Sequence, residues 1–321
     1  MPEHGPRIAV QLFGHLRTWQ SCAAALREHV LDRYDCDVFV HTWDRTDHQT
    51  GTWHDSSSAP APVEAALIES TYAPVSLKIE TQDFLEEEGT FGRHRISLLG
   101  IRYMLYSKYQ ATLLREEHQR ARGAAYDYVL VTRPDILLHA ALKFEDYADQ
   151  FRFFDGCSIH LVHGPNSYVL DDRIFSVPIA SDCLYFAKPE VVDMITRAYL
   201  DFERFFRQGG ALWPEGLLHP EEVFFERIRQ KGIVPKCYRF YYSIRRTDPS
   251  QDVGLLPASE RPEPEPVAPE AGRGFKAMLR WLVDRSPRPV LRLFRRVQAR
   301  MSDVGAYIDR LEDGREARRS N

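Results

Sequence analysis

Hydrophobic and polar positions follow two different periods along the first part of the chain. Residues 7–13, which are mostly apolar, read as a buried strand, and residues 37–42 read as a second strand. Between them, apolar residues recur at helical spacing: Trp19, Cys22, Ala23, Leu26 and Val30. The chain therefore opens with a predicted strand–helix–strand unit, which is typical of a parallel sheet.

The alternation of strands and helices continues beyond this unit. After a polar loop at residues 44–61, the pattern predicts a helix near 63–71, a strand near 75–80 and a long amphipathic helix over 97–121. The next apolar strand, starting at Tyr126, should then be an interior member of a mostly parallel sheet. The expected fold class is α/β, with a Rossmann-type sheet flanked by helices.

Later segments extend the same fold. Residues 182–187 read as a strand, and a helix should follow from Pro189 because proline suits the first turn. Another helix is predicted from Pro220 to Lys231, where Gly232 suits its end. Residues 233–246 are aromatic and extended.

The strand that starts at Tyr126 ends abruptly in Arg133, Pro134 and Asp135. Pro134 cannot donate to a strand ladder and is expected where a strand stops. In open α/β sheets ligands bind at the carboxyl ends of the strands, so the Arg133–Asp135 pair is predicted to contact a ligand. The alternative is a strand-terminal turn with an ordinary arginine–aspartate pair.

The same residues carry a family resemblance. Tyr126 to Ile136, with the sequence YDYVLVTRPDI, resembles the signature of bacterial GT-A-type glycosyltransferases of surface polysaccharide synthesis, including proteins similar to the WavE lipopolysaccharide family. Residues 7–18, 34–44 and 220–233 also resemble segments of this group, although Phe13 and His15 replace more usual residues. Together these segments cover roughly residues 7–246.

The resemblance implies a GT-A-like fold and an enzyme of the hexosyltransferase type. Such an enzyme transfers a sugar from a nucleotide diphosphate sugar, in the first place a UDP-sugar, to a growing surface glycan or glycolipid. The alternative is a non-catalytic protein of the same fold that acts as a scaffold in polysaccharide assembly.

The leaving group of this transfer is a diphosphate that gains negative charge, so a positive group has to meet it. Many GT-A enzymes use an aspartate pair to hold a divalent cation, and here Arg133 stands in the place of the first aspartate. Asp135 is therefore a candidate ligand for Mg²⁺ or Mn²⁺. The alternative is that Arg133 itself neutralises the diphosphate and no metal is needed.

Five further residues at strand ends are candidates for substrate binding. Gly14 and Arg17 follow the first strand, where backbone amides and a guanidinium can approach phosphate. His41, Trp43 and Asp44 end the second strand, where Trp43 could stack on a base or sugar. The alternatives are a routine tight turn for the first two, a satisfied histidine for His41 and a core position for Trp43.

An inverting transfer also requires a carboxylate base to take a proton from the acceptor hydroxyl. Asp182 precedes an apolar strand, and Glu221 and Glu222 lie at a predicted helix N-terminus. These three residues are the catalytic candidates. For the glutamates the alternative is a helix-capping charge alone.

Composition narrows the function classes. The formal net charge of −4 argues against bulk binding of nucleic acid. The chain has no signal-peptide pattern at its start and no apolar run of about 18 residues, so we expect a cytoplasmic protein. Cysteines 22, 36, 157, 183 and 237 are scattered in apolar surroundings and are expected to be buried thiols.

Beyond residue 247 the chain changes character. Residues 257–270 contain five prolines and four glutamates, so we predict a linker over 248–272 that separates a domain at 1–247 from a helical tail at 273–321. Between 271 and 300 there are nine basic residues and one aspartate on amphipathic patterns. Residues 273–301 are therefore expected to bind an anionic membrane surface as a peripheral module. The alternative is a helical hairpin packed on protein.

Overall fold

The computed structural model describes most of the first 255 residues. The described residues are 5–48, 60–91, 96–145, 158–163, 169–170, 173–174, 180–207, 224, 227–228, 230–238, 240–248 and 253–255. All of them belong to one unit, Met1–Glu260. The predicted tail lies outside the described residues.

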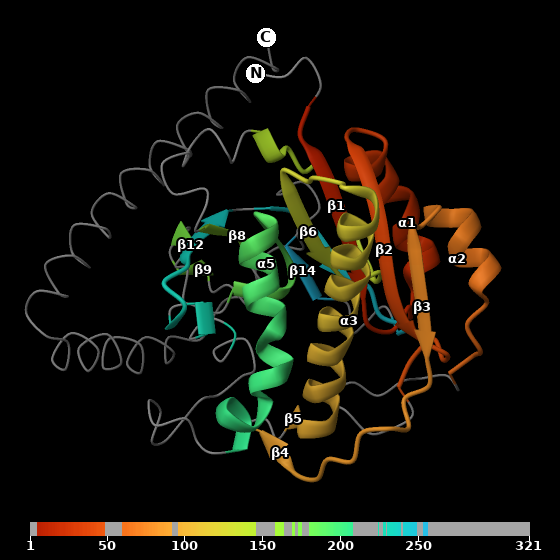
Figure 1. Cartoon of the computed structure of the whole chain (residues 1–321), viewed down its shortest axis with the longest axis vertical. Coiled ribbons are helices and arrows are strands. Elements are labelled where there is room, and N and C mark those ends of the chain that lie inside the picture. The colour runs from red at the N-terminus through yellow and green to blue at the C-terminus, as the bar shows by residue number, and fades with distance from the viewer. Residues whose placement is uncertain are drawn as a thin grey trace, which may run out of the picture. The chain divides into compact units, whose positions relative to one another are not determined.

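A seven-stranded sheet forms the centre of this unit (Figure 1). Its members, in chain order, are β1 (Arg7–Phe13), β2 (Asp35–Trp43), β3 (Ser76–Glu80), β6 (Tyr128–Thr132), β8 (Ser158–His163), β11 (Ala180–Ala187) and β12 (Val234–Tyr238). They lie side by side in the order β12-β8-β11-β6-β1-β2-β3. All run in the same direction except β11, which is antiparallel to both of its neighbours.

The order of the strands reverses between β1 and β6. From β1 the chain moves outward through β2 and β3, and then returns to place β6 on the other side of β1. Leu12 of β1 pairs with Thr132 of β6, and Phe13 pairs with His41 of β2, so the carboxyl ends of the three strands meet at one edge. Ligands of open α/β sheets bind at such a reversal point.

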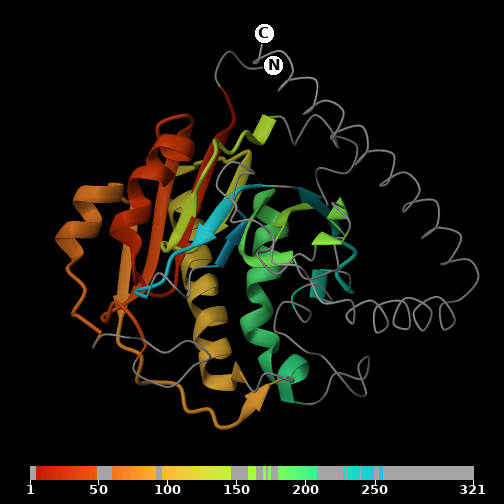
Figure 2. The same ribbon diagram turned by 180° about the vertical axis from the view of Figure 1, so that it is seen from behind.

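Helices cover both faces of the sheet (Figures 1 and 2). The helices α3 (Leu98–Arg122) and α5 (Pro189–Thr196) lie on one face, while α1 (Trp19–Leu26) and α2 (Ala65–Tyr72) lie on the other. A π-helical turn, Arg27–Leu31, continues α1. Shorter elements complete the described chain: β4 (Thr90–Phe91), β5 (Ile96–Ser97), β9 (Val169–Leu170), β10 (Arg173–Ile174) and the turns Arg197–Asp201 and Glu203–Arg207.

Local sequence explains the bounds of α3, the longest of these helices. The Ser97 side chain accepts a hydrogen bond from the Gly100 amide at its start, which satisfies one of the unpaired donors there. At its end Gly123 has a φ of 64°, a left-handed conformation that glycine adopts without steric cost.

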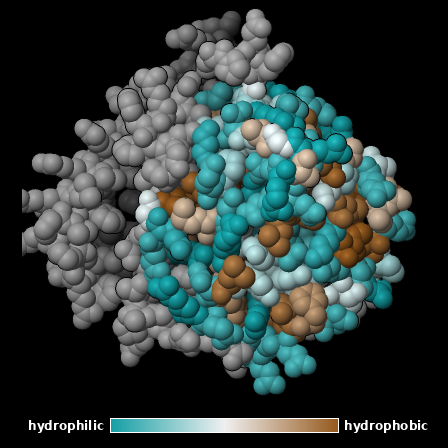
Figure 3. Space-filling model, viewed as in Figure 1, coloured by the Kyte–Doolittle hydropathy of each residue, from teal (hydrophilic) through white to brown (hydrophobic). Residues whose placement is uncertain are grey.

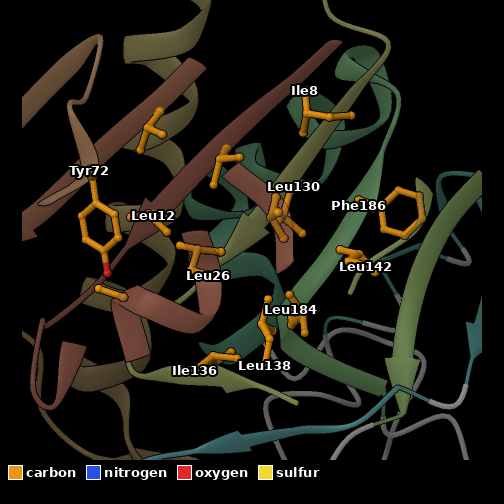
Figure 4. Packing of buried hydrophobic residues seen from close by; sticks show 14 of the residues in the cluster. Ile8, Leu12, Leu26, Tyr72, Leu130, Ile136, Leu138, Leu142, Leu184 and Phe186 are labelled. Carbon is orange, nitrogen blue, oxygen red and sulfur yellow. The ribbon is translucent and has the colours of Figure 1, made fainter. Parts of the chain in front are cut away.

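The alternation of side chains in β1 divides the core into two layers. Ile8, Val10 and Leu12 pack with residues of α1 and α2, whereas Ala9 and Phe13 pack toward α3 and α5. Figure 4 shows part of the first layer, in which Leu12 and Leu26 approach the residues of β6 and β11. On the face in Figure 3, hydrophobic side chains form separate patches within a largely hydrophilic surface.

A second, three-stranded sheet follows the end of β6. It contains β7 (Ile136–Leu138), β13 (Tyr242–Ile244) and β14 (Val253–Leu255) in the order β14-β13-β7. β14 pairs with β13, although its residues lie within the range 248–272 that we predicted as a linker. The other predicted domain boundaries stay predictions.

The expected mostly parallel α/β sheet with flanking helices is confirmed, with β6 as an interior strand, and it is consistent with a GT-A-like architecture. The features that were not predicted include strand β8 of the central sheet, the antiparallel direction of β11 and the sheet around β7. In the part of the chain that the structure describes, no helix combines the length and apolarity required to cross a bilayer.

Candidate active site

Asp135 lies at the carboxyl edge of the sheet and is completely buried. Between the end of β6 at Thr132 and the start of β7 at Ile136, the chain turns so that Arg133 and Asp135 face each other. The Arg133 Nε donates a hydrogen bond of 2.8 Å to Asp135 Oδ1, and Arg133 Nη2 donates to Oδ2. This two-pronged contact matches the planar fork of a guanidinium.

Arg17 reaches the same carboxylate from the loop after β1. Its Nη1 donates to Asp135 Oδ2 at 3.2 Å, and its Nε donates to Asp47 Oδ1 at 2.9 Å. The backbone of Arg17 has a φ of 47°, which few residues other than glycine adopt. A hydrogen bond of 2.7 Å from the Arg17 amide to the Thr46 carbonyl holds it there.

A third guanidinium comes from the end of β13. The Arg246 Nη1 lies 3.8 Å from Asp135 Oδ2, and its side chain is only 8% exposed. The amide of the preceding residue, Arg245, donates 2.9 Å to the Asp135 carbonyl and fixes β13 beside the turn. We call Arg17, Arg133 and Arg246, gathered around Asp135, the arginine cluster.

The charges of the arginine cluster control the ionisation of its members. Burial alone would raise the pKa of Asp135, but the charges of Arg133 and Arg17 outweigh it and hold this pKa below its usual range. Burial, together with repulsion by Arg133 and Arg17, lowers the pKa of Arg246 to about 10. Asp135 is therefore an anion with three guanidiniums around it.

Gly14 lies in the loop that carries Arg17, with a φ of 88° that favours glycine. Its amide donates a hydrogen bond of 2.7 Å to Ser107 Oγ, and its carbonyl accepts one of 2.9 Å from the Thr42 hydroxyl. The Gly14 amide is therefore already bonded inside the protein. The position of the loop agrees with the prediction, but this amide is not available to a phosphate in the described conformation.

His41 is completely buried at the end of β2. Its Nε2 lies 2.9 Å from Glu80 Oε2, and its Nδ1 lies 2.7 Å from Ser107 Oγ. Burial lowers the pKa of His41 to about 4, so the ring is neutral near pH 7. Because the carboxylate only accepts, Nε2 carries the ring proton and Nδ1 accepts from Ser107. These contacts favour the alternative of a satisfied structural histidine.

Trp43 is 1% exposed and also favours its structural alternative. Its ring centroid lies 5.0 Å from that of His41 and 5.1 Å from that of Tyr103. Asp44, the next residue, is half-buried, and its Oδ2 accepts a hydrogen bond of 3.1 Å from the Thr81 hydroxyl. Of the three candidates on this strand end, Asp44 is the one with a partly exposed side chain.

Asp182 lies near Arg133 because β11 runs antiparallel and brings its first residues to the carboxyl edge of β6. Lys108 of α3 donates to Asp182 Oδ2 and to the Asp182 carbonyl, both at 2.8 Å. The aspartate is 5% exposed and the lysine 2% exposed. Burial opposes ionisation of Asp182, but Lys108 outweighs it and lowers the pKa of the carboxyl. A carboxylate with a lowered pKa is a weak proton acceptor.

The structure thus brings Gly14, Arg17, Arg133, Asp135 and Asp182 to one edge. Glu221 and Glu222 lie outside the described residues, so their place relative to this edge stays a prediction.

Sequence reasoning did not select Arg246, Asp47, Lys108 or Ser107, all of which contact candidate residues. Lys108 had a usable signal, because it is the single charged residue in the helical stretch 103–114, which is rich in apolar and aromatic residues. Arg246 had none, because only the pairing of β13 with β7 brings it to Asp135.

The described residues do not fit a divalent cation at Asp135. The carboxylate receives hydrogen bonds from two guanidiniums, and a third lies close by. The nearest acidic candidates are engaged as well: Asp47 with Arg17, and Asp182 with Lys108. No group of three acidic, histidine or cysteine residues suited to a metal occurs in the described ranges. A cation here would meet repulsion from the arginine cluster and have one shared carboxylate as its ligand.

Comparison with known proteins finds similarity among solved structures. No protein-family model matches the chain. No curated protein matches it either. Among solved structures, a glycosyltransferase involved in the glycosylation of the major capsid of PBCV-1 is similar, with 10% identity and a TM-score of 0.34 over 73% of this chain and 83% of that one. A likeness of this extent does not by itself indicate a shared activity.

Proposed function

We propose that this chain is a glycosyltransferase that moves a sugar from a nucleotide diphosphate sugar, in the first place a UDP-sugar, to a surface glycan or glycolipid acceptor. The observation that carries the proposal is the arginine cluster at the carboxyl edge between β1 and β6, where the strand order reverses. The resemblance of Tyr126 to Ile136 to GT-A-type glycosyltransferases supports the same conclusion.

The cluster suits the chemistry of the leaving group. When the bond between the sugar and the diphosphate breaks, negative charge develops on the diphosphate oxygens. Fixed guanidiniums stabilise that charge without rearranging during the reaction, and their planar donors match phosphate oxygens. In this proposal Arg17 and Arg133 bind the diphosphate, while Asp135 holds both side chains in place.

The remaining candidates take different roles. Gly14 shapes the loop that carries Arg17, and the partly exposed Asp44 is a candidate contact for the nucleoside or sugar. His41 and Trp43 support the edge from within the core. For the acceptor proton, Glu221 and Glu222 stay candidates, whereas the pairing of Asp182 with Lys108 supports a structural role for Asp182.

The acceptor proposed above is bound to a surface polysaccharide or lipid, so peripheral attachment to a membrane would serve the reaction. The nine basic residues between 271 and 300 support the proposal that residues 273–301 bind anionic lipid. Localisation at the inner face of the plasma membrane is part of this proposal.

Thermal shift with UDP-, GDP-, CMP- and dTDP-sugars, followed by a turnover assay with each binder, tests the function. A ligand at 100 times its Kd should stabilise the protein by about 2.7 kcal/mol. Release of the nucleotide product in the presence of a glycan acceptor supports the transferase. Binding of a sugar nucleotide with no turnover on any acceptor would favour the scaffold alternative, and the absence of binding would contradict both.

A further inference from the structure

We infer that the arginine cluster binds a diphosphate group directly, without a divalent cation, and that Arg246 is one of its contacts. The inference deepens the proposed function and rests on it for the identity of the physiological ligand. Its physical content, recognition of two linked phosphates by three guanidiniums, can be measured separately from sugar transfer.

The role of Asp135 in this arrangement is to organise cations rather than to bind one. Its two oxygens receive Arg133 in a two-pronged contact and Arg17 from another loop, and Arg246 approaches from the second sheet. A carboxylate that is fully buried beneath three guanidiniums has no open side for Mg²⁺. The Asp135 carboxylate can instead hold the three mutually repelling guanidiniums close enough together to contact one ligand.

Arg17 retains a donor beyond those that Asp135 and Asp47 use. Arg17 donates through Nε to Asp47 and through Nη1 to Asp135, and within the described part of the chain its Nη2 makes no hydrogen bond. The side chains of Arg17 and Arg133 are 14% and 13% exposed, while Asp135 is 0% exposed. The arginines therefore present the accessible atoms of the group, and these atoms are hydrogen-bond donors only.

Repulsion among the three arginines favours an anionic ligand. In the described part of the chain all three guanidiniums converge on the carboxylate of Asp135, and Arg17 also pairs with Asp47. The lowered pKa of Arg246 has burial and the two neighbouring arginines as its causes. A bound diphosphate would offset that repulsion.

The backbone of Arg17 gives independent support. A non-glycine residue at a φ of 47° is held in a sparsely populated conformation, which surrounding structure has to stabilise. Here the amide bond to Thr46 and the side-chain bonds to Asp47 and Asp135 all hold this residue. The strained turn places the Arg17 guanidinium beside that of Arg133 across the reversal point.

Isothermal titration of the full chain with inorganic pyrophosphate tests the inference. We expect binding in EDTA, with an affinity that added Mg²⁺ or Mn²⁺ does not improve, and weaker binding of orthophosphate, which fills half of the site. Titration with UDP distinguishes a nucleoside diphosphate ligand, which should bind more tightly than pyrophosphate, from a free polyphosphate. Pyrophosphate binding that requires a divalent cation would overturn the inference.

Two neighbouring variants isolate Arg246. Arg246→Gln should weaken pyrophosphate binding about 10- to 100-fold, the range expected for a lost charged hydrogen bond. Arg245→Gln alters the adjacent arginine, which contacts Asp135 through its backbone, and should leave the affinity within about twofold. Arg246→Lys keeps the charge and should have an intermediate affinity, which a loss of folding alone would not produce. If Arg246→Gln binds pyrophosphate like the unaltered chain, Arg246 is not a contact.

Failure of the inference is distinguishable from failure of the proposed function. Turnover of a sugar nucleotide with strictly metal-dependent pyrophosphate binding would overturn the inference and leave the function standing. Metal-free pyrophosphate binding without turnover of any sugar nucleotide would support the inference and contradict the proposed function.

Discussion

Arg133 shows how much depends on the shape of a single side chain. It contacts both oxygens of Asp135 through Nε and Nη2 while its charge stays beside the proposed diphosphate. We expect Arg133→Lys to lower kcat/KM for the sugar nucleotide at least about tenfold, because an ammonium group cannot reproduce the planar fork. Steady-state kinetics would measure this, and a lysine variant with near-normal kcat/KM would contradict diphosphate binding by Arg133.

Asp135 should be required for folding as well as for activity. Asp135→Asn leaves three guanidiniums together without the anion between them, and breaking a buried ion pair from one side costs about 3–5 kcal/mol. We therefore expect a large fall in the urea midpoint together with loss of transfer. A variant as stable as the unaltered protein would show that solvent already compensates the arginines.

His41 makes the protein sensitive to mild acid. Its pKa is about 4 in the folded protein and 6.5 in its ordinary state, so the unfolded chain takes up the proton first as the pH falls. The contribution of His41 to the free energy of unfolding is fully present above about pH 6.5. It is lost progressively as the pH falls toward 4, by about 3 kcal/mol in all. Urea unfolding at several pH values should show this slope, and His41→Gln should reduce it. An unchanged slope in that variant would assign the effect to another group.

At the scale of elements, the Lys108–Asp182 pair joins α3 to β11. Asp182→Asn should destabilise the protein by about 3–5 kcal/mol, since the buried lysine loses its counter-charge. The double variant Lys108→Met with Asp182→Leu should recover much of that loss, because apolar residues of similar size can replace a buried ion pair.

Activity of this double variant then separates the two roles of Asp182. If Asp182 is structural, a folded double variant should retain transfer. A stable double variant without activity would instead identify Asp182 as the base.

Sequence alone predicted those elements whose periodicity is long or strong. The apolar runs of β1 and β2 and the long helix α3 each span enough residues to show their period. The three-residue strands β7 and β13 are too short to show a period. The residues of β11 do not indicate whether that strand runs parallel or antiparallel to its neighbours.

The same limit applies to the site. Arg17, Arg133 and Asp135 could be placed because they follow predicted strands directly. Arg246 could not, since its position depends on a pairing between segments far apart in the chain. For His41 and Trp43 the sequence left both the binding role and the structural alternative open, because strand-end position does not specify which side chains a long helix covers.

At the scale of the whole molecule, the described site and the predicted tail should be separable. Every described candidate residue precedes Glu260, where the first unit ends. A chain that lacks residues 261–321 should therefore keep transfer to a soluble acceptor but lose binding to anionic vesicles. Binding of the full chain should also weaken between 0.1 and 1 M salt, as the Debye length falls from about 10 Å to about 3 Å.

Co-sedimentation with anionic and neutral vesicles measures both effects. Equal partitioning to the two kinds of vesicle, or a shortened chain that no longer folds, would favour the alternative of a hairpin packed on protein.

A contact between the first and the last described segments determines when the arginine cluster can form during synthesis. The Thr18 hydroxyl, beside Arg17, donates a hydrogen bond to the Arg245 carbonyl, 227 positions later in the sequence. A growing chain therefore exposes Arg17, and then Arg133 and Asp135, well before Arg246 leaves the ribosome. Closing so long a loop is slow compared with forming local helices. The arginine cluster is consequently among the last parts of the molecule to assemble, and a chain that still lacks Arg246 should bind the proposed diphosphate more weakly than the complete chain.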